Sequence, residues 1–204
     1  MAETPDWRRE RRSGMVAIAV AGAASLLLWF ALYHLLPPLK GMDDIGARFL
    51  VALKCLAVAT LFALVAGVEA VAHERLQSNA FDPLAGHQTR RLEVNLRVLQ
   101  NTLEQIVIFG VGLFGLAAYL SNGEAMRAVP ATTIVWLLNR FAFWIGYHRS
   151  AAMRGLGAPS MAIGLVMLIY VAVRIGSDIA GAPGAVIIFS LYLALEAILF
   201  WKTR

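Results

Sequence analysis

Long apolar runs, separated by short polar or Gly- and Pro-containing stretches, dominate the chain. A helix needs about 20 mostly apolar residues to span a bilayer, and the runs are close to this length. The first run follows a cluster of arginines but is longer than the apolar segment of a signal peptide, so we interpret it as an uncleaved anchor. The pattern predicts six membrane-spanning helices, at residues 15–36, 49–72, 98–120, 128–147, 159–175 and 184–201.

Composition supports the same class of protein. Of the 204 residues, 59% are hydrophobic and only 15% are charged. A soluble domain would be about half apolar and a quarter charged, so an ordinary soluble domain is excluded. The fold class is therefore all-α, a polytopic membrane helical bundle. The single cysteine, Cys55, excludes an internal disulfide, and the four histidines lack metal-ligand spacing, so no metal site is expected.

The basic residues are distributed unevenly about the predicted spans. If the spans alternate in direction, both termini and the segments 73–97 and 148–158 share one side, which holds most of the Lys and Arg residues. Cytoplasmic loops carry this excess, so we expect both termini in the cytoplasm, with residues 1–14 as a basic N-terminal segment. The same bias explains the net charge of +5, and nucleic acid is not expected as a partner. The compact loops suit a bacterial inner membrane, although an endoplasmic-reticulum protein would have a similar pattern.

One polar face lies at the start of the third predicted span. Arg97, Asn101 and Glu104 occupy positions i, i+4 and i+7, within an arc of about 60° on a helix. Ionisable groups in a bilayer are costly and mark a functional site by default. The alternative interpretation is that Arg97 and Glu104 pair with neighbouring helices while Asn101 bridges them.

A second polar face begins on the fourth predicted span. Arg140, Tyr147 and Arg154 recur at i, i+7 and i+14, with Phe143 on the same side, which predicts Arg154 two turns beyond Tyr147 on a continued helix. Guanidinium groups bind carboxylates bidentately, a carboxylate such as Glu104 holds an ammonium, and a nearby arginine lowers the pKa of a thiol. Glutathione, a zwitterion with two carboxylates and a thiol, has all the groups that these faces suit.

The residues from about 49 to 175 resemble the membrane-associated proteins in eicosanoid and glutathione metabolism, the MAPEG family. The pattern R-x-x-x-N-x-x-E from Arg97 to Glu104 carries the resemblance, together with RFAFWIGYHRSAAMR, which is similar to a helix of leukotriene synthase and microsomal glutathione transferase members. The resemblance implies a four-helix core at 49–175 that forms a homotrimer and binds glutathione as a co-substrate between subunits. The spans at 15–36 and 184–201 are additions, expected to pack around the outside of the trimer.

The same resemblance implies roles for individual residues. Two positions depart from the pattern, because Phe143 and Gln105 stand where some members have tyrosine. By position, the peptide backbone and γ-glutamyl end of glutathione would be held by Arg97, Asn101 and Glu104, and the pocket would be lined by Arg140 and Tyr147. Arg154 would be the catalytic residue that stabilises the thiolate. Arg75 would reach the ligand from the neighbouring subunit.

The leading hypothesis is a membrane-embedded glutathione transferase or peroxidase. Its lipophilic substrate, an electrophile or a lipid hydroperoxide, would approach through the membrane lipid while the charged thiol enters from the cytoplasm. The alternatives are a non-catalytic membrane scaffold and a small transporter, in which the polar residues only pair between helices. Against transport, the chain shows no evident inverted repeat or pair of broken helices.

Overall fold

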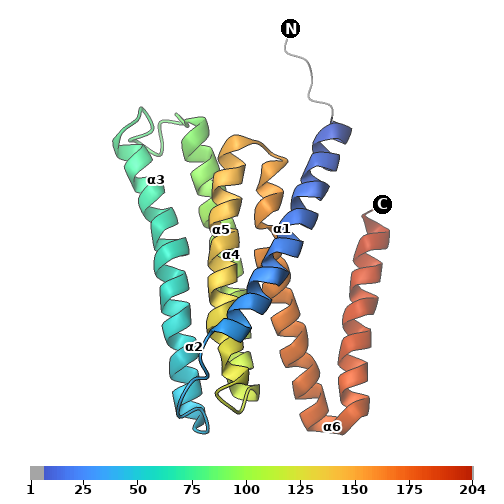
Figure 1. Ribbon diagram of the computed structural model, residues 1–204. Coiled ribbons are helices and arrows are strands. Elements are labelled where there is room, and N and C mark those ends of the chain that lie inside the picture. The colour runs from blue at the N-terminus through green and yellow to red at the C-terminus, as the bar shows by residue number, and fades with distance from the viewer. Residues whose placement is uncertain (1–6, 204) are drawn as a thin grey trace.

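The computed structural model describes residues 7–203, so the first six residues of the basic N-terminal segment and the last residue of the chain lie outside the described part. Within this part all regular structure is helical (Figure 1). The elements are α1 (Trp7–Leu35), α2 (Ile45–Ala59), the π-helical segment η1 (Thr60–Val65), α3 (Ala66–Leu76), α4 (Arg90–Tyr119), the 3-10 turn η2 (Ala125–Arg127), α5 (Ala128–Arg149), the 3-10 turn η3 (Met153–Gly157) and α6 (Ala158–Lys202).

Five helices of the described chain are long and apolar enough to cross a membrane, and the last of them is bent into two arms. The bend lies at Ala180 and Gly181, where Gly181 has a φ of +64° that favours glycine. The arms meet closely, since a Cβ on Gly176 would lie 2.7 Å from the carbonyl oxygen of Gly184. With the other four helices, the two arms account for the six predicted spans, and the all-α membrane bundle is confirmed.

The helices run between two ends of the bundle. The start of α1 and the end of α6 lie at one end, together with the α3–α4 connection and the turn between α5 and η3 (Figure 1). We call this the terminal end. The connections at 36–44 and 120–124 and the bend of α6 lie at the opposite end. Which end faces the cytoplasm stays a prediction from the basic residues.

Capping residues extend several helices beyond their apolar runs. The Oγ1 atom of Thr89 accepts a hydrogen bond from the backbone N–H of Leu92 at 3.0 Å, so α4 begins two turns before the apolar run predicted at 98–120. Asp44 caps α2 in the same way, accepting from the backbone N–H of Ala47 at 2.7 Å. The polar first turns of α4 therefore project beyond the apolar centre of the bundle.

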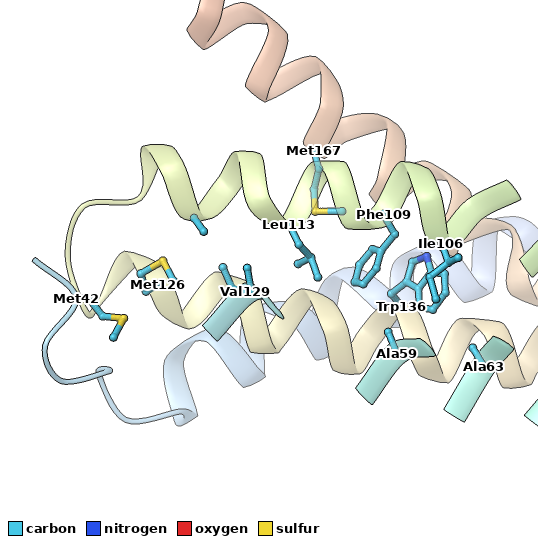
Figure 2. Packing of buried hydrophobic residues seen from close by; sticks show 12 residues of the cluster. Met42, Ala59, Ala63, Ile106, Phe109, Leu113, Met126, Val129, Trp136 and Met167 are labelled. Atoms are coloured by element: carbon cyan, nitrogen blue, oxygen red, sulfur yellow. The ribbon is translucent and has the colours of Figure 1, made fainter. Parts of the chain in front are cut away.

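The apolar core lies where α2, α4 and α5 meet. Phe109 of α4 stacks on Trp136 of α5 with ring centroids 4.4 Å apart, and both side chains are fully buried (Figure 2). Small residues of α2 and η1, such as Ala59 and Ala63, face this pair, which lets the helices approach closely. Met167 of α6 closes the cluster (Figure 2).

The first helix, α1, crosses α5 and η3 diagonally (Figure 1). Side-chain hydrogen bonds attach it to α5, and one of them runs from the hydroxyl of Ser25 to Asn139 Oδ1 at 3.2 Å. Asn139 Nδ2 donates to Ser25 Oγ at 2.9 Å, and Trp29 Nε1 donates to Thr132 Oγ1 at 2.8 Å. Because such bonds are directional, they set the rotation of α1 on the bundle, whereas apolar contacts alone would be compatible with several rotations.

Candidate functional site

Arg140 joins the two polar faces that the sequence singles out. It lies on α5, is 3% exposed, and donates to Asn101 Oδ1 at 2.8 Å and to Thr102 Oγ1 at 2.6 Å on α4. Its guanidinium carbon lies 4.7 Å from the ring centroid of Phe143 on the same helix. A buried cation is stabilised when hydrogen bonds and aromatic faces replace its water. These contacts do so for the two terminal nitrogens of Arg140, whereas its buried Nε atom has no hydrogen-bond partner within the described chain.

A chain of amide and hydroxyl groups continues from Arg140 to α6. Asn101 Oδ1 also accepts from Gln105 Nε2 at 3.1 Å, and Gln105 Oε1 accepts from the hydroxyl of Ser160 at 2.8 Å. The Asn101 oxygen thus accepts two hydrogen bonds, whereas its Nδ2 group has no hydrogen-bond partner among residues 7–203. Sequence reasoning missed the roles of Thr102, Gln105 and Ser160; the spacing of Asn101 and Gln105 at i, i+4 was the only available signal.

The aromatic residues of α5 connect Arg140 to Arg154. Phe143 and Tyr147 lie on one face of α5 with ring centroids 5.6 Å apart, as their spacing predicts. Arg154 also contacts Tyr147, with its guanidinium carbon 5.9 Å from the ring centroid. A series of contacts therefore runs from Arg140 through Phe143 and Tyr147 to Arg154, and Arg154 itself is exposed.

The turn after α5 corrects the predicted placement of Arg154. The i, i+7, i+14 spacing placed Arg154 on a continued helix, two turns beyond Tyr147, and this is wrong. α5 ends at Arg149, and the next residue, Ser150, is extended. The chain then reverses, and η3 brings Arg154 back to the side of Tyr147.

Glycines make this reversal possible. A Cβ on Gly157 would lie 2.6 Å from the Cα atom of Phe143, and a Cβ on Gly146 would overlap the backbone of η3. On its other side η3 touches α1, since a Cβ on Gly155 would lie 2.9 Å from the carbonyl oxygen of Gly14. The turn that carries Arg154 is therefore held between α5 and α1 by backbone contacts, a feature that depends on distant parts of the chain.

Arg97 and Glu104 lie on the outward side of α4, and both are exposed. Glu104 accepts only from Gln100 of its own helix, at 3.3 Å. Among the described residues the ion pairs are Arg91 with Glu74 and Arg127 with Glu124, so the alternative pairing of Arg97 and Glu104 with neighbouring helices is absent within the described chain. The bridging part of that alternative is present, because Asn101 links α4 to α5.

A cavity of about 200 Å³ at the terminal end brings Arg97 and Tyr147 together. Glu104 lies farther along α4, and Arg75 is half-buried on α3; neither lines this cavity. The structure thus unites five of the seven candidate residues through contacts or a shared cavity and leaves Arg75 and Glu104 apart. The remaining lining residues, which the sequence did not indicate, are Arg90, Glu93, Val94 and Ala151.

The helices of this bundle are long enough to span a membrane, and polar side chains gather at one end of it. These two features are those of an integral membrane protein with a polar site at one end of its helices. The model of the MAPEG family matches residues 49–177, and the chain belongs to this family. Membership places it among membrane-associated proteins of eicosanoid and glutathione metabolism. No curated protein and no solved structure matches the chain. The matched region ends just before the bend of α6, so α1 and the second arm of α6 lie outside it.

Replacing Arg140 with Met is expected to destabilise the protein by about 2 kcal/mol. The change removes the two hydrogen bonds that the charged Arg140 donates to Asn101 and Thr102. The thermal unfolding midpoint in detergent measures the effect. Arg149→Met is the matched control, because Arg149 is exposed at the end of the same helix. Equal midpoints for the two variants would show that the Arg140 network contributes no stability.

Proposed function

We propose that the protein is a membrane-embedded glutathione transferase or peroxidase, with glutathione as co-substrate and a lipophilic electrophile or lipid hydroperoxide as the second substrate. The observation that carries this proposal is the convergence of Arg97 and Tyr147 on one cavity, with Arg154 stacked on Tyr147. The family membership of residues 49–177 supports it. A cationic site at the end of apolar helices can bind the charged thiol substrate next to a lipophilic substrate that is dissolved in the membrane.

The side chains divide into binding and activating groups. Arg97 binds a carboxylate of glutathione, the free amide N–H group of Asn101 donates to its peptide backbone, and Glu104 binds its ammonium. Arg154 stabilises the thiolate. In transfer, the sulfur forms a new C–S bond and the leaving group departs with the bonding electrons. In hydroperoxide reduction, two glutathione molecules supply two electrons and two protons. The hydroperoxide is reduced to an alcohol and water, and the two thiols are oxidised to the disulfide.

The outward face of α4 supports a homotrimer. Arg97, Gln100, Glu104, Val107 and Val111 follow one another at alternating spacings of three and four residues, the repeat of helices that pack along a seam. The side of the helix that they mark is exposed, with Val107 at 61% and Val111 at 57%. Polar groups at this depth are costly against lipid, which favours a neighbouring subunit as their surroundings. Glu104, and Arg75 of the adjacent subunit, would then approach the ligand. A trimer mass in mild detergent tests this.

We propose that the protein lies in a bacterial inner membrane with both termini on the cytoplasmic side. The orientation rests on the basic residues at the terminal end. The parity of the helices agrees, since both chain ends lie at one end of the bundle (Figure 1). Single-cysteine labelling from either side tests the orientation. Labelling of positions 40 and 90 from the same side would contradict it.

The scaffold alternative is favoured by one observation, the internal hydrogen bonding of Arg140 to Asn101 and Thr102. Thermal unfolding in the presence of glutathione separates the two functions. A ligand that binds only the folded protein stabilises it by about 2.7 kcal/mol at a concentration of 100 times Kd. An unchanged midpoint at millimolar glutathione would favour the scaffold.

Glu104→Gln is expected to weaken glutathione binding about tenfold while leaving the unfolding midpoint unchanged. The carboxylate is exposed and its hydrogen-bond partner in the described chain is on the same helix, so its charge stabilises the bound ligand and not the folded state. Isothermal titration measures the affinity. Glu196→Gln is the matched control, because Glu196 is also exposed and accepts from a residue four positions earlier, Tyr192, at 3.0 Å. Loss of stability with unchanged affinity would assign Glu104 a structural role.

A further inference from the structure

A second cavity, of about 370 Å³, lies at the terminal end between α3, α4 and α5. It is separate from the cavity of Arg97, although the same two helices contribute to both. Arg90 and Tyr147 line the first cavity, while their sequence neighbours Arg91 and His148 line the second. The two cavities therefore lie on different sides of the contact between α4 and α5, and nothing in the proposed thiol chemistry uses the second one.

The wall of the second cavity is an ordered polar cluster. Asn95, only 4% exposed, accepts from Trp144 Nε1 at 2.9 Å and lies 2.9 Å from His148 Nε2. Since an indole N–H can only donate, the Asn95 atom it meets is the oxygen, and since that oxygen can only accept, His148 Nε2 carries a proton. In the neutral imidazole the other nitrogen, Nδ1, is then a hydrogen-bond acceptor. His148, which lines the cavity, is therefore held by Asn95 with Nδ1 as its acceptor nitrogen.

The mouth of the cavity holds one carboxylate and one guanidinium. The side chain of Glu74 is 14% exposed; it accepts from Thr89 Oγ1 at 2.8 Å and pairs with Arg91 Nε at 3.3 Å. The side chain of Arg91 is 75% exposed, so its terminal nitrogens are accessible to a ligand. These two charges cancel, and the other ionisable lining groups, His73 and His148, are imidazoles. A net-neutral site with separated charges of both signs matches a zwitterion.

The cavity becomes apolar away from the terminal end. Ala70 and Ile145 line its inner part, and Ile145 is 57% exposed beside Trp144. α3 ends at Leu76 and α5 at Arg149, so the polar part lies in the last turns of helices that span the membrane. This is the depth of lipid headgroups, where Trp side chains are enriched.

We propose that this cavity binds the headgroup of a phospholipid of the ethanolamine type. Arg91 binds the phosphate, the ammonium donates to Glu74 and to His148 Nδ1, and the start of an acyl chain lies along Ala70 and Ile145. An ammonium with N–H donors satisfies both acceptors, whereas the quaternary ammonium of a choline lipid satisfies neither. An anionic lipid without the ammonium leaves Glu74 facing a negative charge.

Native mass spectrometry of the full-length protein in detergent tests the proposal. Phosphatidylethanolamine, phosphatidylcholine and phosphatidylglycerol with identical acyl chains (the ethanolamine, choline and glycerol lipids) are added in turn. The ethanolamine lipid is expected to be retained at least about fivefold more than the other two. Glu74→Gln should reduce its retention to the level of the choline lipid. Glu124→Gln, which removes an arginine-paired carboxylate at the opposite end, is the matched control and should change nothing.

Equal retention of the ethanolamine and choline lipids by the unaltered protein would overturn the proposal, and this comparison needs no variant. Arg91→Met provides a second test if Glu74→Gln fails to fold. It should lower retention of all three lipids, because each carries the phosphate that Arg91 binds. Soluble phosphoethanolamine is the remaining probe. If it displaces the lipid at micromolar concentration, the site recognises a free small molecule and the assignment to a membrane lipid is wrong.

Discussion

Replacing Arg154 with Ala is expected to abolish the ultraviolet signal of bound glutathione thiolate and to lower the transferase rate by about 10²- to 10³-fold. The guanidinium of Arg154 stacks on Tyr147, which lines the cavity of Arg97. A cation at this position favours the thiolate, and a thiol pKa that rises by one unit costs the charged form about 1.4 kcal/mol. Difference absorbance with added glutathione and the rate with a model electrophile measure the two effects.

Arg149→Ala is the matched control for Arg154→Ala. Arg149 is exposed at the end of α5, only five positions away along the chain, and it lines neither cavity. Both variants should keep the oligomeric mass of the unaltered protein. A normal thiolate signal and rate in Arg154→Ala would make Arg154 an anchor for lipid phosphate, and Tyr147 or Arg75 would become the candidate for thiol activation.

Gly157→Ala is expected to destabilise the protein by about 3 kcal/mol and to displace the turn that carries Arg154. The added Cβ would lie 2.6 Å from the Cα atom of Phe143 and 2.8 Å from the carbonyl oxygen of Asn139. These are backbone atoms of a packed helix, so the strain is relieved only if η3 moves away from α5. The unfolding midpoint in detergent measures the first effect, and glutathione affinity measures the second.

Gly22→Ala is the control for that substitution. Nothing lies within 4 Å of the Cβ that it adds on α1, and alanine is the better helix former, so its midpoint should equal or slightly exceed that of the unaltered protein. Equal midpoints for Gly157→Ala and Gly22→Ala would mean that η3 does not need its close contact with α5.

Part of the site could be predicted because its residues share a helix. Positions three, four and seven residues apart lie on one helical face whatever surrounds the helix, so the ring of Phe143 contacts that of Tyr147 as their spacing predicts. The same periodicity grouped Arg97, Asn101 and Glu104 on α4. The periodicity could not show that Asn101 accepts a hydrogen bond from Arg140 while Glu104 remains exposed. Which of the two residues contacts Arg140 depends on where α5 crosses α4.

The sequence by itself determined the membrane class, the apolar segments that form the long helices, and the helical faces that group Arg97 with Asn101 and Phe143 with Tyr147. Each of these depends on hydropathy and on helical period, which are properties of neighbouring residues. Only the tertiary structure decided that α5 stops at Arg149 and that η3 returns Arg154 to Tyr147, since this requires glycines to meet backbone from other segments. It likewise decided that Asn95, Trp144 and His148 form the wall of a second cavity. Contacts between helices are set by packing across the bundle, and no local pattern encodes them.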